Sequence, residues 1–515
     1  MLHLCHGNQL EDLADRLVLD LTRPVKDVLA PDLIAVPGQG IARWLSLRLA
    51  HQQGIIANTL WQFPAELLWH LFRTILGNVP ATNAFSADAL AWRVLNVLID
   101  EEFVAAHPPL SHYLESGDPQ RRWQLAQRLG RLYEQYLVYR PDWIRHWQYQ
   151  AAENWQGALW RQLIDAGDDR HWLIAQQEML RRLNSDPSAV KQLPERISLF
   201  ALPTLSPAYL EFLRAVSKHI DVTIYHQNFS RGYWAEIISE KERARLIANA
   251  GEAADQYFET GNSLLATMGR QGREQLAGLL QLEALETEVF RSPPSNTVLG
   301  QIQSDIFELR ERDDSQPFEL KPDDDSLQLH CCHSIMREIE VAHDQLLGLF
   351  QADHTLEPAD VLVLVPEIDV FAPYVDAVFG AATGNRYIPW RLVGRGLAEA
   401  SPLVEAFLAL LDLPFSRFEA DKVTALLDRP VLRRRFGLLE TDTEQVRRWV
   451  QELGICWGVD IGDMAELEFS TGGIHTWRAG TDRLLLGHAL GEAGAMFSGI
   501  LPRAPSDGGE AQIVG

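Results

Sequence analysis

Residues 32–50 have the pattern of a buried strand that leads through a glycine-containing turn into a helix. The strongly apolar run Asp-Leu-Ile-Ala-Val at 32–36 is followed by Pro-Gly-Gln-Gly at 37–40 and by a helical pattern over 41–50. A short strand at 2–6 and an amphipathic helix over 8–21 precede this region. Strand, glycine turn and helix form the entry unit of a nucleotide-binding α/β domain, so we predict an α/β fold.

The remainder of the first 325 residues alternates between helical and strand-like patterns. Helical periodicity from about 65 to 190 predicts an all-α insertion, and strands return at 197–201 and 221–225 around a helix at 209–218. Loop-like segments at 292–297 and 313–325 carry four prolines, which indicates a domain boundary. We therefore predict a first α/β domain over 1–325 and a second domain over 326–515.

The second domain repeats the alternation of strands and helices before becoming mostly helical. Apolar runs at 327–332, 360–365 and 388–393 are predicted strands, and 336–351 and 368–379 are predicted helices. After Ser401 the pattern is helical. The expected architecture is two α/β domains with large all-α insertions.

The turn at 37–40 stands where a phosphate-binding loop would stand, but it lacks the residues for ATP chemistry. Such a loop needs a lysine to neutralise phosphates and a serine or threonine hydroxyl for Mg²⁺. Gly38 and Gly40 are present without either, although Arg43 could meet a phosphate. We interpret Gly38 and Gly40 as a degenerate nucleotide loop that binds no cofactor of its own.

No other motif in the sequence indicates catalysis or a metal site. The zinc-protease, zinc-finger and serine-hydrolase patterns are all missing, and the carboxylates are spaced as on solvated faces. His330 and His333 flank Cys331 and Cys332, but two histidines at a strand end are typical of a core rather than of a metal centre. All four cysteines are interpreted as buried thiols of a reducing compartment.

A basic and aromatic segment, residues 121–145, is the strongest candidate for ligand binding. The formal charge of the chain is −24, which argues against a general nucleic-acid coat protein, but phosphates respond to local charge. This segment has six arginines against two acidic residues, and Arg128, Arg131 and Gln135 recur on one helical face. Guanidinium and amide groups suit phosphates and base edges. A merely solvated charged face is the alternative.

The same segment carries a resemblance to a known family. Residues 135–143, Gln-Tyr-Leu-Val-Tyr-Arg-Pro-Asp-Trp, resemble a signature of the RecC family, and further similar blocks follow the family's order along the chain. Those blocks lie at 36–45, 54–58, 63–69, 206–210, 232–234, 302–306, 332–338 and 475–478. The resemblance therefore covers nearly the whole chain and marks it as similar to the amino-terminal half of such a protein.

What the resemblance implies is a DNA-handling subunit without its own catalytic site. RecC proteins have two RecA-like domains of the superfamily 1 helicase type that have lost their ATPase motifs. They assemble with RecB and RecD, which use ATP and Mg²⁺, in a cytoplasmic helicase and exonuclease that processes double-strand breaks for recombination. They split duplex ends and guide the 3′-ended strand through a channel that scans for the Chi sequence.

The resemblance also assigns candidate channel residues. Eight positions match the family's channel residues: Gln39, Arg43, Phe63, Trp69, Leu132, Glu134, Gln135 and Arg140. Arg43 replaces an amide side chain, and Arg131 stands where an acid is usual, so the recognised sequence stays open. Two other functions remain as alternatives: an autonomous ATP-driven helicase of the AddB kind, and a protein-interaction module on a helical scaffold. The sequence has no apolar run of membrane-spanning length and no evident leader, which favours the cytoplasm.

Overall fold

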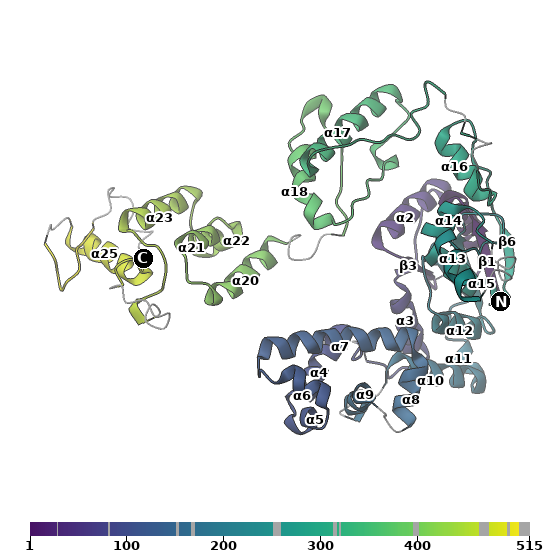
Figure 1. Cartoon of the computed structure of the whole chain (residues 1–515), viewed down its shortest axis with the longest axis horizontal. Helices are drawn as coiled ribbons and strands as arrows, with labels where there is room; N and C mark the ends of the chain where they lie inside the picture. Colours follow the sequence, from purple (N-terminus) through teal and green to yellow (C-terminus); the bar gives the residue numbers. More distant parts are fainter. Residues whose placement is uncertain are drawn as a thin grey trace. The chain divides into compact units, whose positions relative to one another are not determined.

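The computed structural model describes two compact units, Met1–Gln328 and Leu329–Gly515 (Figure 1). The described residues are 1–27, 29–80, 83–150, 154–165, 170–250, 259–312, 317–318, 321–394, 401–462, 473–491 and 495–503. The division lies close to the boundary expected at 325, although part of the loop predicted at 313–325 lies outside the described residues.

The first unit is built on a six-stranded sheet in the order β3-β2-β4-β5-β1-β6. Every neighbouring pair is parallel. The strands are β1 Leu2–Gly7, β2 Asp32–Ala35, β3 Thr59–Gln62, β4 Arg196–Phe200, β5 Asp221–Gln227 and β6 Leu285–Glu288. The predicted α/β fold is confirmed for this unit, because a parallel sheet covered by helices is its defining feature.

The two edge strands, β3 and β6, were not predicted from the sequence. All four residues of β3 are only half-buried, and three of the four residues of β6 (Leu-Glu-Thr-Glu) are exposed. An edge strand packs fewer neighbours than a central one, so it lacks the continuous apolar run by which the four inner strands were predicted.

Helices cover both faces of the sheet, with a separate core under each. On one face, α1 Leu10–Leu21 and α2 Gln39–Gln53 pack on Cys5 and Ile34. On the other, α3 Pro64–Leu76, α10 Trp172–Ser185 and α12 Pro207–Val216 pack on a larger core that includes Leu4 and Leu33. Alternate residues of β1 and β2 therefore enter opposite cores, as the two-residue period of a strand requires.

The predicted all-α insertion lies between β3 and β4 (Figure 1). Besides α3 and α10, it contains α4 Ala87–Ile99, α5 Glu101–Ala105, α6 Pro108–Leu114, α7 Pro119–Tyr139, α8 Pro141–Tyr149, α9 Trp155–Asp165 and α11 Pro187–Val190. The helices between β5 and the end of the unit are α13 Glu240–Ala250, α14 Ser263–Met268, α15 Arg270–Leu280 and α16 Val298–Phe307.

The start of the long helix α7 and its packing against α4 both follow from particular residues. Pro119 occupies its first turn, and the Asp118 side chain accepts a hydrogen bond from the Gln120 amide. At Gly130 the helix lies directly against α4: a Cβ there would be 2.5 Å from the carbonyl oxygen of Ala87. Only glycine permits this close approach of two helices.

The second unit is helical in its described residues. Its helices are α17 Ile335–Ala352, α18 Ile368–Phe379, α20 Pro402–Asp412, α21 Ala420–Leu427, α22 Pro430–Phe436, α23 Glu440–Leu453 and α25 Trp477–Leu490, with 3₁₀ turns at Pro358–Asp360, Gly384–Arg386 and Leu413–Phe415. The helices predicted at 336–351 and 368–379 are confirmed as α17 and α18.

The prediction of strands at 327–332, 360–365 and 388–393 is wrong for the described residues. None of these segments belongs to a strand, and the described residues of the second unit contain only an isolated bridge between Phe497 and Ile500. Leu362 and Leu364 are 81% and 83% exposed. An apolar run becomes a strand only beside a hydrogen-bonding neighbour, and here the described chain provides none.

Among the described helices, none is long and apolar enough to span a bilayer.

Candidate nucleic-acid interface

The carboxyl edge of the first unit's sheet brings together several of the residues singled out in the sequence. In parallel α/β sheets, ligands bind outside the carboxyl ends of the strands. Helices α2 and α3 start directly after the neighbouring strands β2 and β3, and the Val36 amide donates to the Gln62 carbonyl oxygen at 3.0 Å. The turn at 37–40 and Phe63 therefore lie side by side at this edge.

The turn before α2 presents open backbone to solvent. Gly38 is the N-cap residue of α2 and caps no amide through a side chain, while Gln39, Gly40 and Arg43 are exposed. A Cβ at Gly38 or Gly40 would meet no atom within 4 Å, so the turn is uncrowded. Exposed amides at a helix start favour an anion, and Arg43 adds a positive charge one turn later.

Phe63 at the start of α3 and Trp69 within it occupy different environments. Phe63 is the N-cap residue, its amide donates to the Glu66 carboxylate at 2.9 Å, and its ring is 37% exposed. Trp69 is half-buried and lies edge-on to Phe72, with ring centroids 5.6 Å apart. Phe63 is therefore available for stacking, whereas Trp69 contributes mainly to the core.

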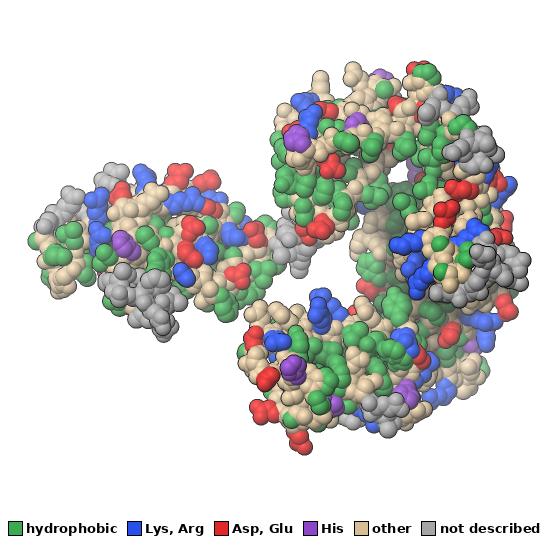
Figure 2. Space-filling model, viewed as in Figure 1, with side chains coloured by type: hydrophobic (Ala, Val, Ile, Leu, Met, Phe, Trp, Pro, Cys, Tyr) green, Lys and Arg blue, Asp and Glu red, His purple; other side chains and the backbone are tan. Residues whose placement is uncertain are grey.

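The basic face predicted on α7 is present. Arg128, Arg131 and Gln135 are all exposed, and a small group of basic side chains stands over α7 in Figure 2. The carboxyl end of α7 packs against α12, which begins after β4 at the same edge of the sheet. Burial raises the pKa of Tyr209 on α12, and the neighbouring Tyr139 of α7 raises it further. The carboxyl end of α7 therefore lies at the same edge of the sheet as the turn before α2.

Three other candidates on or beside α7 have structural contacts. The Glu134 carboxylate accepts the Ala87 amide at 3.1 Å and so holds the start of α4, while Leu132 is half-buried against the core. Arg140 donates from Nε and Nη2 to Asp142 at 3.0 and 2.7 Å, and its guanidinium lies 3.6 Å from the centre of the Trp143 ring. That hydrogen bond lowers the pKa of Asp142.

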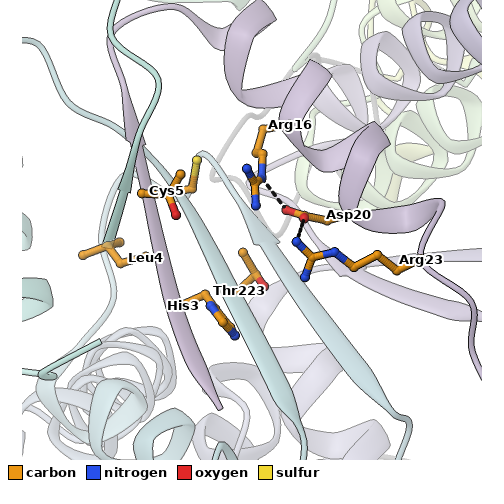
Figure 3. A pocket seen from close by; sticks show the side chains of 8 residues that line it. His3, Leu4, Cys5, Arg16, Asp20, Arg23 and Thr223 are labelled. Carbon is orange, nitrogen blue, oxygen red and sulfur yellow. Dashed lines mark hydrogen bonds and ion pairs between the residues drawn. The ribbon is translucent and has the colours of Figure 1, made fainter. Parts of the chain in front are cut away.

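Ion pairs form part of the lining of a small polar cavity between α1 and the sheet (Figure 3). Asp20 accepts from Arg16 at 3.0 Å, pairs with Arg23 at 2.9 Å and accepts the Tyr225 hydroxyl at 2.8 Å. Burial raises the pKa of the Cys5 thiol in its wall to about 11, so the thiol stays protonated at neutral pH. This cluster stabilises the packing of α1 on the sheet.

The cysteines only partly match the prediction. Cys5 is buried and Cys332 half-buried, but Cys331 and Cys456 are exposed. The prediction of four buried thiols was wrong because the segment around Cys331 is not a core strand. Within the described ranges, no three side chains of His, Cys, Asp or Glu are grouped so as to hold a metal ion.

The loop after β5 was not identified as a site from the sequence. Phe229 and Tyr233 are 45% and 60% exposed in it, at the same edge of the sheet. The available signal was the alternation of aromatic and polar residues in Asn-Phe-Ser-Arg-Gly-Tyr-Trp at 228–234, directly after a predicted strand. Only its last three residues had been noted, as a block of family resemblance.

Comparison with known proteins gives a consistent result. A family described as "RecC, N-terminal domain" matches residues 2–309, and one described as "RecBCD enzyme subunit RecC fourth domain" matches residues 400–515. The chain is 35% identical to the "RecBCD enzyme subunit RecC" of Escherichia coli (strain K12), over 100% of this chain and 50% of that protein. A protein of the same name from Haemophilus influenzae is 32% identical, over 99% of this chain and 50% of that protein. Another, from Mycolicibacterium smegmatis, is 31% identical, over 95% of this chain and 46% of that protein.

The chain thus spans about half the length of the curated relatives that it matches. The first family alone accounts for more than half of the residues, including the sheet and the helices that carry the arginine face. The chain belongs to the RecC family.

Proposed function

We propose that this chain is a non-catalytic, DNA-binding and scaffold part of a RecBCD-type helicase and exonuclease in the cytoplasm. In this proposal it binds RecB and RecD, which use ATP and Mg²⁺, and it acts on double-stranded DNA ends and on the single strands released from them. The name of the relatives, "RecBCD enzyme subunit RecC", supports the choice of partners.

One observation carries the DNA-binding part of the proposal. The exposed Arg128, Arg131 and Gln135 follow one face of α7, whose carboxyl end reaches the sheet edge that also bears Arg43 and Phe63. A row of guanidinium groups that leads to an exposed ring and an uncrowded turn suits a single strand, because phosphates meet the charges and a base can stack on the ring.

The strand proposed to follow this path is the 3′-ended one, scanned there for a Chi sequence. The amides of Gln39 and Gln135 both donate and accept hydrogen bonds and the arginines donate them, which suits base edges and supports readout of sequence as well as backbone binding. Glu134 and Arg140 would take part only after giving up their contacts with Ala87 and Asp142.

The wider architecture proposed is that of two RecA-like domains without ATPase activity. The parallel sheet with helices on both faces supports this for the first unit. The lysine-free turn at Gly38 and Gly40 supports the loss of ATP chemistry, because it provides no magnesium ligand. For the second unit, the proposal draws on α17 and α18, which alternate with apolar segments.

Site-directed crosslinking tests where the strand runs. The exposed Cys331 and Cys456 and the half-buried Cys332 are replaced by serine, and a single cysteine is introduced as Gln135→Cys on the arginine face. A photoreactive group attached there is expected to crosslink an oligothymidine. The control is Arg181→Cys on α10, an exposed helical position that lies towards the opposite, amino edge of the sheet.

Equal crosslinking from both positions would show that the strand does not follow α7 and would reject the proposed path. The non-catalytic part is tested separately by ATP hydrolysis. Hydrolysis by the purified chain that disappears with Arg43→Ala would contradict it.

A further inference from the structure

The loop between β5 and α13, residues 228–234, is held rigidly at the carboxyl edge of the sheet. It follows Gln227 directly, and the Asn228 amide donates to the carbonyl oxygen of Gly7 at 2.9 Å. Since β5 lies between β4 and β1, the loop stands beside the start of α12, against which α7 packs. The loop therefore adjoins the edge that carries the proposed strand path.

Three buried residues anchor the loop from below. Asn228, Ser230 and Trp234 are 6%, 0% and 1% exposed. The Trp234 indole donates to Asn228 Oδ1 at 2.7 Å, and the Ser230 hydroxyl donates to the Phe307 carbonyl oxygen at 2.8 Å. The Gly232 amide then donates to Ser230 Oγ at 3.0 Å. Because these polar groups are paired inside the protein, the loop has a fixed backbone.

The residues between the anchors point outward. Phe229 and Tyr233 are exposed, and the guanidinium of Arg231 is paired with Glu308 at 2.6 Å. One edge of the Phe229 ring lies near Gly272 of α15, where an added Cβ would be 4.0 Å from Phe229 Cε2, and the ring centroid lies 6.5 Å from that of the buried Trp234. One side of this ring is thus supported while the ring stays accessible. Two exposed aromatic rings on a rigid loop lose little entropy when they stack on a planar ligand.

We propose that Phe229 and Tyr233 form a base-stacking site for single-stranded nucleic acid, a second contact beyond the arginine face of α7. The inference rests on the proposed function for its choice of ligand. Arg231 is largely neutralised by Glu308, so the site recognises bases rather than phosphates. Its contribution to binding is therefore nearly independent of salt.

The spacing of the sheet fits this ligand. From β3, which ends at Gln62 just before Phe63, to β5, which ends just before this loop, the order β3-β2-β4-β5 contains three strand spacings. At about 4.8 Å each they separate the two strands by roughly 14 Å. About four stacked nucleotides cover this distance at about 3.4 Å each. A short oligonucleotide can thus reach Phe63 and Phe229 together.

The test compares the chain with a variant that lacks both rings, Phe229→Ala with Tyr233→Ala, and with a variant that keeps them, Phe229→Tyr with Tyr233→Phe. Binding is measured by fluorescence anisotropy with a 12-residue oligothymidine and with an abasic oligonucleotide of equal length. We expect the ring-less variant to lose at least about 25-fold in affinity for oligothymidine, about fivefold or more for each ring. The abasic strand should bind equally to all three proteins.

Several results would overturn the inference. Unchanged affinity of the ring-less variant for oligothymidine would exclude stacking, and loss of RecB binding in that variant would then indicate a protein partner. An equal loss on the abasic strand would show that the loop holds the backbone instead. Should the double variant fold poorly, Tyr233→Ala alone, at the more exposed position, gives the same comparison.

Failure of this site is distinguishable from failure of the proposed function. Crosslinking from position 135 reports on α7 alone, so it persists if only the loop inference is wrong. If no crosslink forms from position 135 but the ring-less variant still binds oligothymidine more weakly, the α7 path is rejected and the stacking site is kept.

Discussion

Replacing Arg128 and Arg131 together by alanine should flatten the salt dependence of single-strand binding. The two side chains are exposed and three residues apart on α7, which is about 4.5 Å along the helix axis. That separation is enough for each to meet its own phosphate. Neither has to be withdrawn from the core, so the substitution should leave the fold intact.

The size of the effect follows from counterion release. Each phosphate neutralised on a single strand contributes about 0.7 to the slope of log affinity against log salt, so two lost contacts remove about 1.4. Between about 50 and 200 mM salt, a fourfold change, the ratio of the unaltered chain's affinity to that of the double variant should therefore fall by roughly sevenfold. The chain carries a net charge of −24, so these local cations act against general repulsion and the affinity loss at low salt should be large.

Anisotropy titrations of a labelled oligothymidine at four salt concentrations measure both slopes. The matched control is Arg181→Ala with Arg182→Ala on α10, which removes the same charge from exposed helical positions near the amino edge of the sheet. If both double variants shift the slope equally, the effect is one of net charge, and the assignment of a strand path to α7 is refuted.

Further predictions concern the stability and solubility of the fold. Burial lowers the pKa of His171 to about 3, below the value near 6.5 expected when unfolded, so only the unfolded chain gains its proton as the pH falls through this window. In denaturant titrations, His171→Gln should reduce the loss of stability between pH 6.5 and pH 5 by about 1.6 kcal/mol, while His226, whose pKa burial also lowers to about 3, keeps contributing to the remainder. Gly130→Ala should cost about 1–3 kcal/mol in the same assay because its Cβ would press on α4, whereas Gly348→Ala, with open space around it, should cost nothing. Leu362→Ser with Leu364→Ser should reduce light scattering by the purified chain, because both side chains are exposed. The free energy of unfolding should change by less than about 0.5 kcal/mol, and a larger decrease in it would mean that these side chains are packed.

The α/β fold of the first unit was predictable because its inner strands are buried on both faces. Apolar runs at 32–36, 197–201 and 221–225 correspond to β2, β4 and β5, and the glycine turn correctly predicted the start of α2. The edge strands β3 and β6 were missed, since half-exposed residues leave no periodic signal. In the second unit the same apolar signal led to strands that are not formed in the described chain.

The candidate site was predictable as a set of residue types but not as an arrangement. Helical periodicity correctly placed Arg128, Arg131 and Gln135 on one exposed face of α7. It gave no information on Glu134, whose carboxylate holds the start of α4, or on Arg140, which is paired with Asp142. Whether a charged side chain is available depends on partners distant in sequence or on local geometry, which a one-dimensional pattern does not contain.

By itself, the sequence determined the parallel α/β core, the arginine face of α7 and the likeness to the RecC family, because burial, helical period and motif order are all encoded locally. Tertiary structure alone decided that the turn before α2, Phe63, the end of α7 and the Phe229 loop share one edge of the sheet. That edge depends on the strand order β3-β2-β4-β5-β1-β6, in which strands far apart in the chain become neighbours through hydrogen bonds. Such long-range pairing is a property of the folded backbone and leaves no local trace in the sequence.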